Sequence, residues 1–128
     1  MLNLACLLED SATNHPDRMA LVQGDRSMTY AELNEAAARV AGWLVEHGLQ
    51  PGERVLLACP NLVEFPVVYY GVLKAGGVVV PVNVLLQASE LAYHLRDAEA
   101  AFFFCHEGSA ELPLGSRGRE AFAGADQC

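Results

Sequence analysis

The chain has 128 residues, a length that fits one ordinary domain, and 52% of them are hydrophobic, which is enough to bury a core. Sixteen acidic residues against eight basic ones give a net charge of -8 at pH 7. Because the basic residues are scattered, this composition excludes the basic patch of a nucleic-acid-binding protein and disfavours binding to an anionic membrane surface.

The cysteines at positions 6, 59, 105 and 128 form no C-x-x-C pair, and this spacing argues against a zinc site. We expect Cys59 and Cys105 to close two hydrophobic strands as small apolar side chains, and we expect reduced thiols in a cytoplasmic protein. The first ten residues lack a positively charged leading segment, so they predict no export signal. Residues 65–86 are long enough to span a bilayer, but Lys74 near their centre, Gly76-Gly77 and Pro81 predict that they do not.

The first elements predicted along the chain are a short helix and a hairpin. Residues 2–13 have helical spacing, with Leu4, Leu7 and Leu8 on one face. Residues 19–23 then predict a strand, and residues 24–26 a turn into a second short strand that ends near Tyr30.

A long helix is predicted to begin at Thr29, which forms a capping box with Glu32. Trp43 widens its apolar face, and Gly48 ends it as a left-handed residue. Five residues with helical spacing form the stripe that we expect to be buried: Leu33, Ala37, Val40, Leu44 and His47.

The next segment predicts a strand–helix–strand unit. Residues 54–59 are almost entirely apolar, as in a strand buried on both faces of a parallel sheet, and residues 78–82 predict a second such strand. Between them, Asn61 and Glu64 resemble a helix cap, and helical spacing continues up to Gly76. Pro66 conflicts with a cap at Asn61 and predicts a kink or a late start of the helix.

Residues 87–98 and 101–105 repeat the plan as a helix and a third strand, whereas residues 106–128 are polar, with a short helix near 119–123. The predicted fold class is α/β, with three layers, a mostly parallel sheet built from βαβ units, and a small N-terminal hairpin. We divide the chain into residues 1–105, a domain part, and residues 106–128, a polar surface segment. Three parallel strands leave open sheet edges, as in a piece of a larger protein.

Few residues are candidates for chemistry. The sequence has no G-x-x-x-x-G-K-[ST] or G-x-G-x-x-G phosphate loop and no G-x-S-x-G elbow, and we place Gly115 and Gly118 in a loop. The histidines at positions 15, 47, 94 and 106 are isolated, so we expect helix-end or surface roles. Lys74 is explained by the dipole of its helix, with contact to a ligand phosphate as the functional alternative.

The order and spacing of several motifs resemble the N-terminal part of the AMP-forming acyl-activating enzymes, which include acyl- and aryl-CoA synthetases and peptide-synthetase adenylation domains. The resemblance covers about residues 2–105. The matching residues are Thr29-Tyr30-Ala31-Glu32-Leu33, Leu49-Gln50-Pro51-Gly52-Glu53-Arg54-Val55, Pro60-Asn61, Glu64-Phe65, Gly71-Val72-Leu73-Lys74-Ala75-Gly76, Val80-Pro81-Val82-Asn83 and Glu90-Leu91-Ala92-Tyr93. Val84, Gln87-Ala88 and Pro66 depart from the family pattern.

The resemblance implies a ligase that uses ATP with Mg²⁺ to convert a carboxylic acid to an acyl-adenylate, and coenzyme A to form the thioester. The family's phosphate loop, magnesium motif, ribose-binding aspartate and catalytic lysine have no counterpart in residues 1–128. We therefore assign no catalytic, cofactor-binding or metal-binding residue, and we expect no cofactor to bind this chain by itself.

Our first hypothesis is an inactive N-terminal fragment of a cytoplasmic acyl-CoA synthetase, most similar to fatty-acid-CoA ligases. An aryl-CoA ligase or a peptide-synthetase adenylation domain is the enzymatic alternative. A non-enzymatic interaction module is the alternative from a different class. The expected partners are the acid and coenzyme A in the parent enzyme, with no nucleic acid and no membrane span, and a homodimer is left open.

Overall fold

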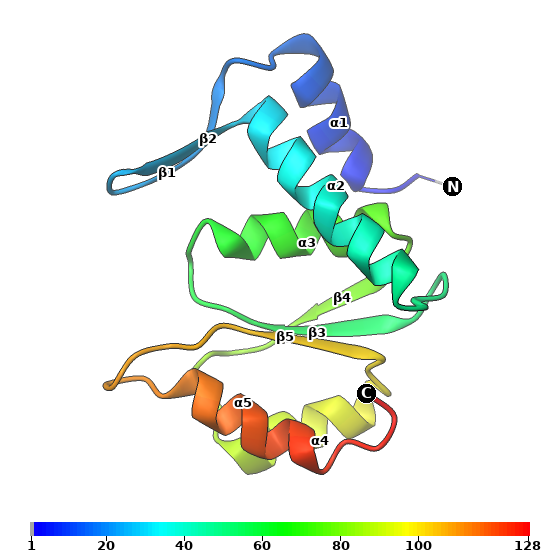
Figure 1. The fold of residues 1–128 in the computed structure, drawn as a ribbon, viewed down its shortest axis with the longest axis vertical. Helices are drawn as coiled ribbons and strands as arrows, with labels where there is room; N and C mark the ends of the chain where they lie inside the picture. The colour runs from blue at the N-terminus through cyan, green and yellow to red at the C-terminus, as the bar shows by residue number, and fades with distance from the viewer. Residues whose placement is uncertain (1) are drawn as a thin grey trace. The chain divides into compact units, whose positions relative to one another are not determined.

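The computed structural model describes residues 2–128 and divides them into two compact units (Figure 1). The first unit contains the residues up to Gly52 together with Asn61–Gly77, and the second contains Glu53–Pro60 and Val78–Cys128. Both units are therefore discontinuous in sequence.

The first unit contains three helices and a two-stranded hairpin. Helix α1 (Ala5–Asn14) leads to the antiparallel strands β1 (Met19–Gln23) and β2 (Arg26–Thr29), which are followed by helices α2 (Tyr30–Glu46) and α3 (Glu64–Lys74). The predicted hairpin is confirmed, with its two strands joined by Gly24-Asp25.

Helix α2 begins directly where strand β2 ends. Thr29 is its N-cap, and the Thr29 hydroxyl oxygen accepts the N–H of Glu32 at 3.2 Å, as the sequence predicts. The N–H groups of Tyr30 and Ala31 are donated to the carbonyl oxygens of Arg18 and Pro16, at 2.9 and 3.1 Å. All three N–H groups of the first turn therefore have acceptors. The helix ends before Gly48, whose φ of 95° confirms the predicted left-handed residue.

The core of the first unit lies between the helices and the hairpin. Leu8, Leu33 and Ala37 are buried there, and Val67 and Tyr70 of α3 pack against them. Ala20, Leu21 and Tyr30 complete this cluster.

Two apolar faces predicted in the first unit are buried only in part. Leu4 and Leu7 are more than half exposed, because α1 begins only at Ala5, where the Asn3 side chain accepts the Ala5 N–H at 2.9 Å, and turns Ala5 and Leu8 inward.

On α2, Trp43 and His47 are exposed and stack on one another with ring centroids 4.1 Å apart. Their position at the solvated end of the helix explains why the stripe ends at Leu44.

Helix α3 starts late, which is the second of the two outcomes that Pro66 predicts. The helix begins at Glu64, so Pro66 is its third residue and its missing N–H falls in the first turn, where no intrahelical partner exists. The predicted cap at Asn61 is wrong, because the N-cap residue is Val63, whose N–H is accepted by the Gln23 side chain at 2.9 Å.

Helices α2 and α3 approach closely at Gly71. A Cβ atom placed on Gly71 would lie 2.6 Å from both Cβ and Cγ1 of Val40 and 3.0 Å from the Ala37 carbonyl oxygen. A side chain at position 71 is therefore excluded by packing.

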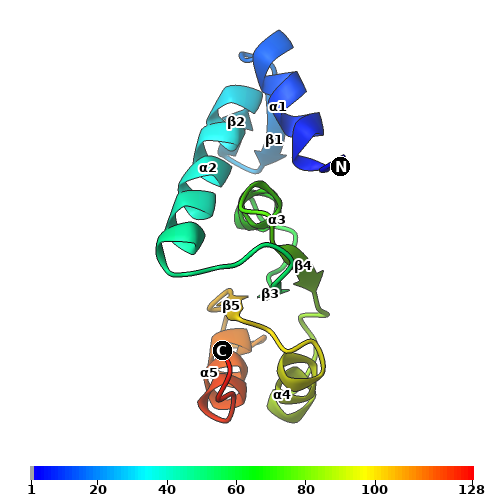
Figure 2. The same cartoon turned by 90° about the vertical axis from the view of Figure 1, so that its right-hand side faces the viewer.

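The second unit is a parallel sheet with two helices. Strands β3 (Arg54–Ala58), β4 (Val78–Pro81) and β5 (Phe102–Cys105) have the order β4-β3-β5, and β3 pairs in parallel with both neighbours. Helices α4 (Ala88–Asp97) and α5 (Leu114–Ala123) lie on the same side of this sheet (Figures 1 and 2). The predicted α/β class with a parallel sheet and a separate hairpin is confirmed.

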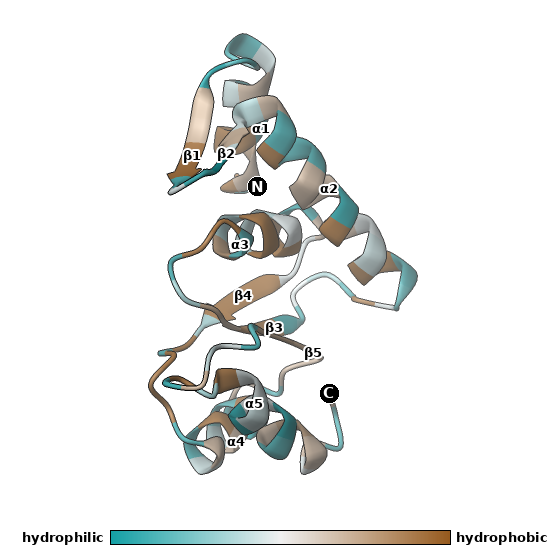
Figure 3. Ribbon diagram, turned by 60° about the vertical axis from the view of Figure 1, so that its left-hand side comes forward, coloured by the Kyte–Doolittle hydropathy of each residue, from teal (hydrophilic) through white to brown (hydrophobic). Residues whose placement is uncertain are grey.

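The core of the second unit lies between the sheet and these two helices. Alternate residues of the central strand, Leu56 and Ala58, face Leu91 and Leu95 of α4, and all four side chains are fully buried. Strand β4 is strongly hydrophobic, whereas α5 combines hydrophobic and hydrophilic residues (Figure 3). Pro81 ends β4 at one edge of the three-stranded sheet, where its missing N–H is tolerated.

Helix α5 is longer than the sequence predicts, and it is part of the core. Residues 114–123 are helical, Leu114 is fully buried and Ala121 is 3% exposed. The prediction of a loop around Gly115 and Gly118 is wrong. Both glycines lie in α5, and a Cβ on Gly118 would lie 2.5 Å from Cys105 Sγ. Glycine allows this helix to lie directly against β5.

Residues 65–86 form most of α3, a turn, strand β4 and the start of the loop before α4. Within residues 2–128, no helix is long and apolar enough to cross a membrane. The four cysteines are free thiols, with Cys6 exposed and Cys59 buried.

Candidate functional site

The carboxyl edge of the parallel sheet is the place where ligands bind in open α/β sheets, at the point where the strand order reverses. Here the chain passes from β3 to β4 on one side and then places β5 on the other side of β3. The reversal therefore falls between the ends of β3 and β5, where the His106 N–H is donated to the Ala58 carbonyl oxygen at 2.8 Å. Residues 105–108 lie at the end of β5 beside this point.

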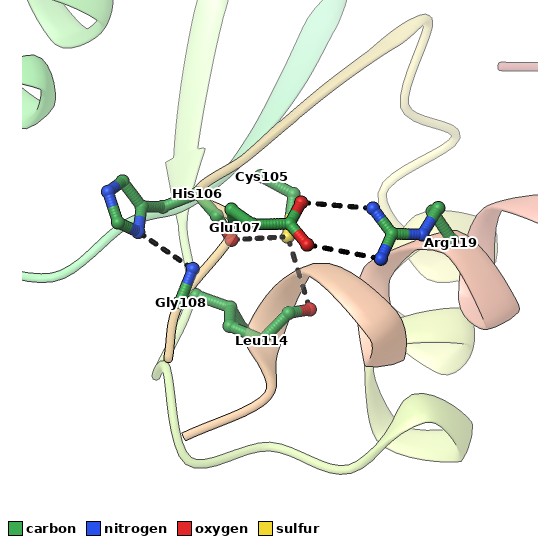
Figure 4. A network of polar contacts seen from close by, with 6 residues as sticks. All are labelled: Cys105, His106, Glu107, Gly108, Leu114 and Arg119. Carbon is green, nitrogen blue, oxygen red and sulfur yellow. Dashed lines mark hydrogen bonds and ion pairs between the residues drawn. The ribbon is translucent and has the colours of Figure 1, made fainter. Parts of the chain in front are cut away.

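An ion pair joins the segment after β5 to helix α5 (Figure 4). Arg119 donates from its two terminal nitrogens to the two Glu107 oxygens, at 3.0 and 3.2 Å. The hydrogen bond and the charge of Arg119 lower the pKa of Glu107, and the same contacts with Glu107 raise the pKa of Arg119. A carboxylate that is held charged in this way is a poor general base at neutral pH.

The Cys105 thiol lies beneath this ion pair, 3.5 Å from the carbonyl oxygens of His106 and Leu114 (Figure 4). Burial raises its pKa, and the negative charge of Glu107 raises it further. Because the thiolate is the nucleophilic form of cysteine, this raised pKa disfavours the reactive form of Cys105.

The His106 ring fixes the turn that follows β5. Its Nδ1 accepts the N–H of Gly108 at 3.0 Å, which requires Nδ1 to be unprotonated (Figure 4). Gly108 has a φ of 81°, and a Cβ at this position would lie 2.2 Å from the Leu112 carbonyl oxygen. The imidazole therefore supports a tight turn that only glycine fits.

A pocket of about 230 Å³ lies between β5 and α5. Phe103 and Phe122 give it apolar walls, the Glu107–Arg119 pair is its polar boundary, and Gly115 and Gly118 leave room on the helix side. Because both charges at its boundary are already paired, the pocket presents no free charge to a ligand.

This arrangement does not assemble a catalytic group. A nucleophile needs a base within hydrogen-bond reach, but the contacts of Cys105 are to carbonyl oxygens and Nδ1 of His106 is bonded to the backbone. Within residues 2–128, no three His, Cys, Asp or Glu side chains are grouped so as to hold a metal ion.

Lys74, for which contact with a ligand phosphate is the functional alternative, already forms an ion pair. Lys74 lies in the last turn of α3, and its Nζ is 2.8 Å from a carboxylate oxygen of Glu9 in α1. Only 11% of the Lys74 side chain is exposed, against 52% for Glu9. The helix dipole and this pair account for the lysine without a phosphate.

The other histidines that sequence analysis considered lie at helix ends. His15 and His47 are the C-cap residues of α1 and α2, and His94 lies in the last turn of α4. This agrees with the predicted helix-end roles.

The Glu107–Arg119 pair is not predicted from the sequence. The residues are twelve positions apart, and the glycines between them indicated a loop. Leu114, Gly118 and Ala121 are small or apolar residues at helical spacing. This pattern is the signal that could have placed Arg119 on a helix.

A second pocket, of about 250 Å³, lies in the first unit between β1 and residues 61–66. Its walls are mainly apolar and include Leu21, Val22, Leu62, Phe65 and Pro66. Its polar lining residues are Gln23 and Asn61, and no charged side chain lines it.

Comparison with known families gives one match over most of the chain. The model of the family described as "AMP-binding enzyme" matches residues 8–125.

Two curated relatives are bacterial ligases. A medium/long-chain-fatty-acid–CoA/3-oxocholest-4-en-26-oate–CoA ligase of Mycobacterium marinum is 40% identical over 92 residues, which are 72% of this chain and 17% of the relative. A long-chain-fatty-acid–CoA ligase of Bacillus subtilis is 40% identical over 98 residues, which are 77% of this chain and 18% of the relative. The chain thus spans less than a fifth of the length of these relatives.

Solved structures with the same fold include a benzoate CoA ligase from Burkholderia xenovorans LB400, with a TM-score of 0.86 and 31% identity over 98% of this chain and 24% of that chain. The N-terminal domain of FACL13 from Mycobacterium tuberculosis matches all of this chain and 37% of that chain, with a TM-score of 0.80 and 32% identity.

Proposed function

Because the chain belongs to the AMP-binding enzyme family, we propose that it is one part of an acyl-CoA ligase that activates a carboxylic acid with ATP and transfers it to coenzyme A. The observation that carries this proposal is the 40% identity, over about three quarters of the chain, to a long-chain-fatty-acid–CoA ligase. In the proposed reaction the acid carboxylate attacks ATP and releases pyrophosphate, and the thiol of coenzyme A then displaces AMP from the acyl-adenylate.

The part that this chain plays is structural. Residues 2–128 do not fit ATP with Mg²⁺, because they contain no phosphate-loop motif and no cluster of metal ligands. The ion pair at the end of β5 is neutral overall, so it does not supply a free cation for a phosphate. We assign the chemistry to parts of the ligase outside this chain.

A fatty acid is the substrate that we favour. Both curated relatives, each 40% identical over about three quarters of the chain, are fatty-acid–CoA ligases. An aryl acid is the second candidate, because the benzoate CoA ligase matches 98% of the chain with a TM-score of 0.86.

The first experiment tests whether the chain is inactive by itself. The purified 128-residue protein is assayed for pyrophosphate exchange into ATP with octanoate, palmitate and benzoate. We expect no acid-dependent exchange with any of them. Exchange above that of a heat-denatured sample would show that the chain contains an active site, and our assignment would be wrong.

The second experiment tests the ligase assignment itself. The matching 98-residue segment of the Bacillus subtilis ligase is replaced by the corresponding segment of this chain, and acyl-CoA formation is measured with the same three acids. We expect thioester formation with palmitate, because the rest of the chimera comes from a long-chain-fatty-acid–CoA ligase.

The matched control for the chimera carries Leu56→Asp, which places a charge in the fully buried centre of the sheet and should abolish activity together with folding. A chimera that is folded by circular dichroism but forms no thioester would contradict the assignment.

A further inference from the structure

We draw no further inference here: the strongest candidate, the apolar pocket of about 250 Å³ between strand β1 and residues 61–66, carries no proposal because nothing in the structure shows what covers it.

Discussion

Helices α3 and α5 are held in place by the same two devices, but in very different surroundings. Each has a glycine pressed against a neighbouring element, Gly71 against Val40 and Gly118 against Cys105, and each has an ion pair to a distant carboxylate. The Lys74 side chain of α3 is 11% exposed, whereas the Arg119 side chain of α5 is 67% exposed. The comparison indicates that the same contacts should contribute more to stability in α3.

The largest effect is expected for Gly71→Ala. The new methyl group would overlap Val40 at 2.6 Å, where the nearest atom is the Cβ of a stiff, branched side chain, so the helices must move apart. Overpacking of this kind costs about 1–3 kcal/mol of unfolding free energy, from which a gain of up to about 1 kcal/mol in helix propensity is subtracted. Urea unfolding followed by circular dichroism measures the difference.

The control is Gly42→Ala, since Gly42 is also inside a helix but has no atom within 4 Å of the added Cβ. This change should stabilise the protein by about 0.5–1 kcal/mol. Equal stability of the two variants would show that the close approach at Gly71 is not a constraint.

The next effect is expected for Glu9→Gln. The substitution removes the carboxylate that pairs with Lys74, whose side chain is only 11% exposed, and leaves the ammonium group without a charged partner. Because Glu9 is half exposed, we expect a loss of about 1–2 kcal/mol, below the range for a fully buried pair.

Glu35→Gln is the comparison for this variant, because Glu35 and Arg39 form an exposed pair within α2 at 3.4 Å. Loss of that pair should cost about 0.3–0.5 kcal/mol. Thermal unfolding of both variants at low and high salt separates the two cases, and the Glu9 effect should persist at high salt. If the loss of stability in Glu9→Gln vanishes at high salt, the Glu9–Lys74 pair behaves as an ordinary surface ion pair.

A smaller loss, about 1 kcal/mol, is expected for Gly118→Ala, because the obstructing atom is a cysteine sulfur that can rotate away. The double variant Gly118→Ala/Cys105→Ala removes this sulfur. Its loss of unfolding free energy should therefore be smaller than the sum of the losses in the two single variants. Strict additivity would mean that the helix, and not the sulfur, has moved.

The smallest effect at neutral pH is expected for Arg119→Gln, because the pair that it breaks lies in solvent. What distinguishes this variant is the pH dependence of its stability relative to the wild type. The folded-state pKa of Glu107 is lowered by Arg119, so the contribution of the pair is present above the ordinary pKa of glutamate and is lost as the pH falls through the lowered value. The difference in unfolding midpoint between wild type and variant should therefore disappear in acid. A difference that grows in acid would have the wrong sign.

The contrast between these helices also explains what the sequence could predict. Helix α3 carries a continuous apolar pattern, and Pro66 predicts a kink or a late start, of which the structure shows the late start, at Glu64. Helix α5 has two glycines in its first half, and helix propensity gives no hint that Gly118 lies against Cys105 of β5 and Gly115 against Glu107. Tertiary packing, and not local propensity, therefore determines that residues 114–123 are helical.

In the candidate site, too, local features can be predicted from the sequence, whereas contacts between distant residues cannot. Two features of the site are local in sequence. They are the turn at Gly108 and the position of His106 directly after the predicted strand 101–105. The Glu107–Arg119 pair depends on the path of the chain between the two residues, which no local pattern encodes. Leu4, Leu7 and Trp43 fit an apolar stripe by spacing, but spacing alone does not fix which part of that stripe meets a neighbour.

The start of helix α2 has a consequence for how the first unit opens. Strand β2 ends at Thr29, the helix cap, and the residues just before β1 accept the first two N–H groups of the helix. No spare residue separates strand from helix, so neither can rotate or fray alone. The hairpin and the first helical turn should therefore exchange their amide hydrogens as one cooperative unit, at a common rate set by a single opening event.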